Sequence, residues 1–352
     1  MTNPYRGLPD YHFWKRSVAG VSIEDLDPVV STTFTIKKQD KVVTAGSCFA
    51  QHVARYLKNS GFNYYVTEPG NPLIAPVAER NGYGVFSARY GNLYTTRQLL
   101  QLYLRAHGLF HPVESIWRRE DGAYVDPYRP QIQPCGFSSP EELLADREQH
   151  FAMVRKAFDE MDVFVFTLGL TESWISRLDG SVFPVAPGVS GGEFDEKKYR
   201  FVNFGVSEVV EDLQNFLSLA SSKNKSFKTI LTVSPVPLMA TAEDRHVLVS
   251  TTLSKSILRV AADIVEKSGK EIMYFPSYEM ITGNYTRGKY YASDLRSITE
   301  SGVSRVMSVF MNHFSNEKTI RAEEAQKTDN YIDELEEVVR VQCEEEALGK
   351  IG

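Results

Sequence analysis

The stretch Lys41–Ala54, with the sequence KVVTAGSCFAQHVA, predicts the first unit of the fold. Val42 and Val43 are apolar and β-branched, which suits a strand covered on both faces. Gly46 permits a sharp change of direction because it has no Cβ atom. Apolar residues then recur at helical spacing as far as Leu57, and Gly61 follows as a left-handed helix end. We therefore expect a buried strand, a tight turn and a helix.

This arrangement places Ser47 where a parallel strand ends and a helix begins. Open α/β sheets bind their ligands at the carboxyl ends of their strands. The N-terminus of a helix also favours developing negative charge. Ser47 is therefore a candidate nucleophile, and a solvated serine in a plain turn is the structural alternative.

Composition narrows the classes of protein. The chain has 352 residues, 42% of them hydrophobic and 24% charged, which is typical of a globular protein. Its net charge of −6 argues against a general nucleic-acid binder. Three cysteines without a paired pattern favour a reducing compartment. With no apolar leader and no membrane-length apolar run, the sequence predicts a cytoplasmic protein.

Strand and helix patterns alternate along the chain, which predicts an α/β fold with a mostly parallel sheet and helices on both faces. The expected strands after the first are 63–67, 162–168, 228–234 and 271–275. The expected later helices are 95–104, 141–161, 206–220, 247–267 and 302–314.

Three regions are expected. Residues 1–39 form an arm that packs on the domain through Tyr11, Phe13 and Trp14. Residues 40–320 form the α/β domain, with an irregular or β-hairpin insertion at about 111–140. Residues 321–352 form an acidic helix that packs on the domain or on a second subunit of a homo-oligomer, or stays solvated.

The pentapeptide Gly46–Ala50, GSCFA, is the signature of the GSCFA family, which resembles the SGNH (GDSL-like) hydrolases. The segments 234–237, SPVP, and 274–279, YFPSYE, extend the resemblance. It implies a three-layer, flavodoxin-like fold with Ser47 as the nucleophile. It also implies a serine esterase or O-acyltransferase acting on acylated carbohydrate or a related metabolite, with or without a separate acyl donor. No cofactor, metal or nucleic-acid partner is expected.

The resemblance also implies an oxyanion hole, because acyl transfer needs donors for the developing negative oxygen. Its members would be the N–H groups of Ser47 and Gly84 and the side chain of Thr171. Thr171 stands where SGNH hydrolases carry an asparagine, and a hydroxyl can donate one hydrogen bond. A turn glycine is the alternative at Gly84.

The base is harder to identify. SGNH hydrolases have Asp-x-x-His in their last block, whereas this chain has Asp294 and then Ser297. His246 follows the strand 228–234 and is the best placed of the seven histidines. It could act as the base, oriented by Asp294 or Glu172, or it could simply cap the next helix.

The roles of four further side chains remain open. Lys255 could act as a base for serine or bind an anionic donor or sugar acid, or it could form a surface salt bridge. Glu172 and Ser297 could bind substrate, and Glu172 could instead cap a helix. Cys48 could replace Ser47 as the reactive atom. Without a working base, the chain would be a non-catalytic glycan or nucleotide-sugar binding protein; a scaffold acting through the acidic tail is a third possibility.

Overall fold

The computed structural model describes residues 3–315. Its main sheet has four parallel strands in the order β1-β4-β8-β9, which confirms the predicted α/β class. These strands are β1 (Val42–Gly46), β4 (Val163–Leu168), β8 (Lys228–Val233) and β9 (Ile272–Tyr274). The predicted acidic helix 321–352 lies outside the described residues.

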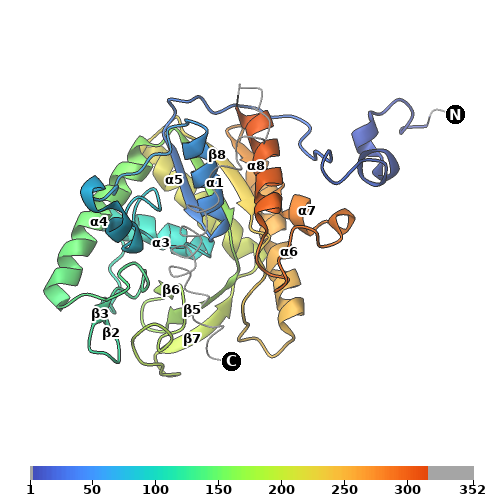
Figure 1. Ribbon diagram of the computed structural model, residues 1–352. Helices are drawn as coiled ribbons and strands as arrows, with labels where there is room; N and C mark the ends of the chain where they lie inside the picture. The colour runs from blue at the N-terminus through green and yellow to red at the C-terminus, as the bar shows by residue number, and fades with distance from the viewer. Residues whose placement is uncertain (1–2, 316–352) are drawn as a thin grey trace.

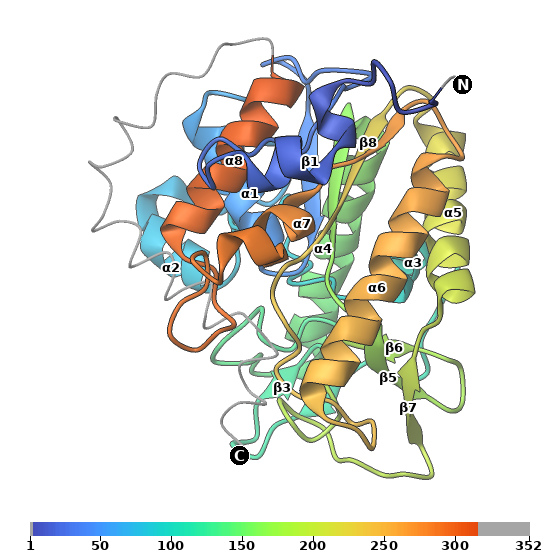
Figure 2. The ribbon, with the colours of Figure 1, turned by 90° about the vertical axis from the view of Figure 1, so that its right-hand side faces the viewer.

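Helices cover both faces of this sheet, as the alternation of side chains along each strand requires. Val43, Phe164 and Leu231 point to a core shared with four helices, α3 (Thr96–Ala106), α4 (Pro140–Glu160), α5 (Val206–Lys223) and α6 (Val247–Glu266). Their neighbours along the strands, among them Val42 and Val163, point to a second core shared with α1 (Phe49–Asn59), α7 (Ser277–Thr282) and α8 (Glu300–Phe314). Figure 2 shows α5 and α6 on one side of the sheet and α1 and α8 on the other.

The predicted helices α1, α3, α4, α5, α6 and α8 are present and begin and end close to the expected positions. The short helices α2 (Ala75–Arg80) and α7 were not predicted. Short helical turns lie at η1 (Asp10–His12), η2 (Lys15–Ala19), η3 (Pro72–Ile74) and η4 (Asn284–Thr286). No helix within residues 3–315 combines the length and apolarity that a membrane crossing requires.

The predicted strand at 63–67 is reduced to one bridge between Tyr64 and Val42. Two hydrogen bonds hold it, from Val42 N to Asn63 O and from Tyr65 N to Val42 O. Thr67 then turns away, because its N–H donates to Ser87 O instead of to β1. The segment therefore adds only a short fifth edge to the sheet.

Two small antiparallel sheets lie below the main one in Figure 1. The hairpin of β2 (Trp117–Arg118) and β3 (Tyr124–Val125) lies inside the insertion expected at 111–140. The strands β5 (Glu172–Ser176), β6 (Val182–Phe183) and β7 (Tyr199–Asn203) were not predicted. They follow β4 directly, so they lie beyond the carboxyl end of the main sheet.

The N-terminal region divides into two parts. Phe34 and Ile36 are buried in the core beneath α8. By contrast, Tyr11 and Trp14 are exposed, so the expected packing of these two side chains on the domain is not observed. Figure 1 shows the first helical turns beside α7 and α8, away from the main sheet.

Candidate active site

The turn after β1 fixes the position of Ser47. Gly46 has a φ of +133°, and a Cβ atom on it would lie 2.2 Å from Thr167 O. Only glycine can therefore hold the backbone of β1 this close to β4. Ser47 N donates to Thr167 O over 3.2 Å, and α1 begins two residues later.

The hydroxyl of Ser47 is buried but has no partner. The residue is 4% exposed, and no group within residues 3–315 hydrogen-bonds to Ser47 Oγ. Leaving a buried hydroxyl unpaired costs about 1–3 kcal/mol. Such a group in a folded protein calls for an explanation, and a functional role is one.

Ser47 borders a small pocket at the carboxyl edge of the sheet. Its polar lining includes Cys48 from the first turn after β1, Ser234 at the end of β8, and Lys255 from α6. Cys48 is half-buried. Its thiol is a second group in the pocket that is able to act as a nucleophile. Strands β1 and β8 therefore both deliver polar side chains to one place, as expected for an open α/β sheet.

Lys255 is buried at 2% exposure, so the surface salt bridge considered for it is not observed. Its Nζ donates to Gly169 O over 2.5 Å. Gly169 lies against Ser47, because a Cβ atom on Gly169 would be 3.1 Å from Ser47 Cβ. The carbonyl that holds the amine thus belongs to a residue in contact with the serine.

The proposed oxyanion donors are all engaged elsewhere. Gly84 N donates to Glu68 O over 2.9 Å, and Thr171 Oγ1 donates to Asn203 Oδ1 over 2.7 Å. Neither Gly84 nor Thr171 lines the pocket at Ser47. Ser47 N already donates to Thr167, so the three groups do not converge on one point.

Sequence reasoning missed the segment that does reach the serine, residues 91–95. Leu93 N donates to Gly46 O over 2.8 Å, and Tyr94 O accepts hydrogen bonds from Gly169 N and Leu170 N. Tyr94 also lines the pocket. The pair Gly91-Asn92 closes the same glycine-rich stretch that contains Gly84, and this was the available signal.

His246 lies apart from the pocket. It is the exposed N-cap of α6, and its Nδ1 accepts a hydrogen bond from Leu248 N over 3.2 Å. His246 precedes Lys255 by nine residues, which is about 13 Å along a helix. The two side chains therefore lie at different positions along α6, and of the two only Lys255 lines the pocket.

Asp294 and Ser297 form a closed turn. Ser297 Oγ donates to Asp294 Oδ2 over 2.6 Å, and the N–H groups of Arg296 and Ser297 donate to Oδ1. Partial burial acts to raise the pKa of Asp294, but these hydrogen bonds outweigh it and lower the pKa below its usual value. Arg296 Nε donates to the carbonyl of Pro237, a residue that lines the pocket. The turn thus borders the pocket wall.

Glu172 begins β5 and is buried. Burial is the main reason that its pKa is raised, although a hydrogen bond from Thr241 opposes the shift. Thr241 Oγ1 donates to Glu172 Oε1 over 2.8 Å, which ties β5 to the loop before α6. Glu172 does not line the pocket at Ser47.

The described residues contain no cluster of three His, Cys, Asp or Glu side chains suited to a metal ion. The family model described as "GSCFA family" matches residues 41–310 of the chain. No curated protein matches the chain.

Proposed function

The chain belongs to the GSCFA family, and from that premise we propose that it is a serine esterase or O-acyltransferase working through an acyl-Ser47 intermediate. The observation that carries the proposal is the buried, unpartnered hydroxyl of Ser47 beside the buried amine of Lys255. An acylated carbohydrate or a related metabolite is the proposed substrate, as the resemblance to SGNH hydrolases implies.

Lys255 is the base that best fits the pocket. As a neutral amine, its Nζ takes the Ser47 proton while Oγ bonds to the acyl carbon. The resulting ammonium returns the proton to the departing alkoxide as the old ester bond breaks. Water or an acceptor hydroxyl then removes the acyl group by the same steps, and its access decides between hydrolysis and transfer.

The negative oxygen formed on the way needs donors. The positive end of α1 points at this position, because Ser47 and Cys48 directly precede the helix. In this scheme Gly84 and Thr171 support the fold, and Ser47 N can serve only if it leaves Thr167 O.

Labelling with a fluorophosphonate probe tests the proposal, because such probes react with activated serine. We expect the wild-type chain to be labelled and Ser47→Ala to show no labelling. Ser60→Ala is the matched control, since Ser60 is exposed at the other end of α1. A folded wild-type chain that resists the probe would contradict the proposal.

A non-catalytic glycan or nucleotide-sugar binding protein is the second candidate. The engaged donors at Gly84 and Thr171 favour it, as does Ser297 in the place of a histidine. Saturable binding of an acetylated sugar without labelling or turnover would select this candidate. The scaffold role considered for the acidic tail concerns residues outside the described range.

A further inference from the structure

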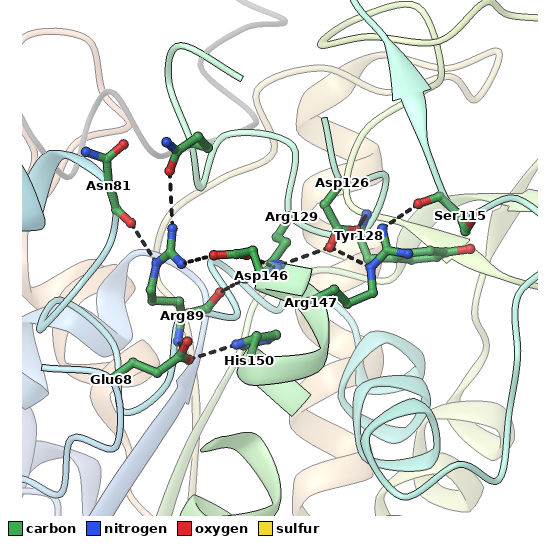
Figure 3. Close-up of polar contacts among 11 residues, drawn as sticks. Glu68, Asn81, Arg89, Ser115, Asp126, Tyr128, Arg129, Asp146, Arg147 and His150 are labelled. Atoms are coloured by element: carbon green, nitrogen blue, oxygen red, sulfur yellow. Dashed lines mark hydrogen bonds and ion pairs between the residues drawn. The ribbon is translucent and has the colours of Figure 1, made fainter. Parts of the chain in front are cut away.

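A second buried polar region lies behind the insertion, between α3, α4 and the β2–β3 hairpin. Figure 3 shows its hydrogen bonds, which join Asp126 to Arg129 and Arg147, and Asp146 to Arg89 and Arg129. We call these residues, with Glu68, His150 and Arg105, the arginine–carboxylate cluster. Its members come from segments spread over 68–150, so it fastens the insertion to the domain.

The charges of this cluster do not balance. The positive groups are Arg89, Arg105, Arg129 and Arg147, and the negative groups are Glu68, Asp126 and Asp146. Burial and the nearby Arg129 charge lower the pKa of His150 to about 4, so its imidazole is neutral at pH 7. One positive charge is therefore left over in a buried region, where an uncompensated charge is costly.

The surplus belongs to Arg105. Arg105 is 8% exposed. Within residues 3–315, no hydrogen bond or ion pair joins its guanidinium to another residue, and the carboxylate of Asp126 acts on it only at longer range. Instead it stacks 3.7 Å above the ring of Tyr128. Stacking engages the face of the guanidinium, so its N–H groups remain available as donors.

His150 supplies the second unpartnered group. It is 1% exposed, and its Nδ1 lies 2.8 Å from Glu68 Oε2, as Figure 3 shows. The carboxylate requires Nδ1 to carry the proton, which leaves Nε2 as a bare acceptor. Nε2 is buried and has no hydrogen-bond partner within residues 3–315.

Arg105 and His150 line one pocket with Gln98, Tyr128 and Arg129. We propose that this pocket binds a small oxyanion that also carries a hydroxyl group, with inorganic phosphate as the simplest case. The anionic oxygens accept hydrogen bonds from Arg105, and the hydroxyl donates to His150 Nε2. Such a ligand neutralises the surplus charge and satisfies both open side chains.

Equilibrium dialysis of the purified full-length chain against radiolabelled phosphate at pH 7, in chloride-free buffer, tests the proposal. We expect saturable binding of one phosphate per chain, weakened about tenfold or more in Arg105→Gln. Arg16→Gln is the matched control, because Arg16 is exposed on the N-terminal turn η2. Sulfate should bind more weakly than phosphate, because it has no hydroxyl at pH 7.

If Arg105→Gln does not fold, Arg105→Lys keeps the charge but loses the planar fork, and it should still weaken binding. Ser47→Ala should bind phosphate as the wild type does, which separates this site from the proposed acyl transfer. Absence of saturable binding to the wild type, or unchanged binding in a folded Arg105 variant, would show that the pocket at Arg105 holds only water. Equal affinity for sulfate would overturn the role of His150.

Discussion

The pocket at Ser47 and the arginine–carboxylate cluster are both buried and polar, but they differ in how far their polar atoms are hydrogen-bonded. In the cluster, Asp126 and Asp146 accept hydrogen bonds from three arginines between them. In the pocket, Ser47 Oγ has no partner among the described residues. Most of the cluster thus stabilises the fold, whereas the pocket keeps an unsatisfied group in place.

This difference in hydrogen bonding separates groups that stabilise the fold from groups that are candidates for a functional role. A satisfied buried network holds segments together, and its removal is felt as lost stability. An unsatisfied buried group lowers stability, so the fold keeps it at the expense of other contacts. Arg105 and His150 Nε2 are the two groups of the cluster that, like Ser47 Oγ, have no hydrogen-bond partner among the described residues.

Asp126→Asn should give the largest effect on stability. It leaves Arg129 and Arg147 buried against a neutral amide, and breaking a buried pair in this way costs about 3–5 kcal/mol. Asp121→Asn is the control, because Asp121 is exposed in the turn between β2 and β3. Urea denaturation of both variants measures the difference. Similar midpoints for the two would mean that the cluster does not stabilise the fold.

Lys255→Met should reduce turnover of an activated ester by about 10²–10⁴-fold, which is the usual contribution of a general base. Lys267→Met serves as the control, since Lys267 is the exposed C-cap residue of α6. His246→Gln should change the rate little. A large loss in His246→Gln with an active Lys255→Met would reverse the assignment of the base.

The cluster should also make stability depend on pH. The pKa of His150 is about 4 in the folded chain, against 6.5 as its ordinary value. The unfolded chain therefore binds the proton first, and stability falls as the pH drops from 6.5 towards 4. The loss at His150 is at most about 3 kcal/mol.

Denaturation at several pH values between 6.5 and 5, in chloride-free buffer, checks this dependence. His150→Gln should flatten the slope, while His12→Gln, at an exposed position, should keep the wild-type slope. His52 is half-buried, and the desolvation of its ring lowers its pKa to about 3, so part of the slope should remain. An unchanged slope in His150→Gln would exclude His150 as its source.

The smallest expected effect is a gain. Ser47→Ala removes a buried hydroxyl that has no partner, so the variant should be more stable than the wild type by about 1 kcal/mol. Thermal unfolding of the two proteins measures it. A clear loss of stability would mean that Ser47 Oγ is hydrogen-bonded in solution, and the contrast with the cluster would weaken.

The sequence predicted those parts of the fold that depend on local pattern. The strand, turn and helix around Ser47 follow from Val42, Val43 and Gly46, and α6 follows from its apolar spacing. Pairing between distant segments was harder to predict. Strands β5 and β7 are short, and the residues between them form a long connection, so the sequence shows no continuous alternating pattern.

The same limit applies to the site. Whether His246 or Lys255 lies near Ser47 depends on the position of α6 along the sheet, and tertiary packing determines that position. Gly84 and Gly91 have the same local character, yet only the segment after Gly91 bonds to Gly46. Local pattern gives residue types, and long-range contacts decide which of them meet.

Mass spectrometry of the chain, quenched during turnover of an activated acetate ester, tests the central claim most directly. We expect one acetyl group per chain, and fragmentation of the peptide containing residues 46–50 should locate it on Ser47 and not on the adjacent Cys48. An acetyl group on Cys48, or a folded and unmodified chain, would contradict the account.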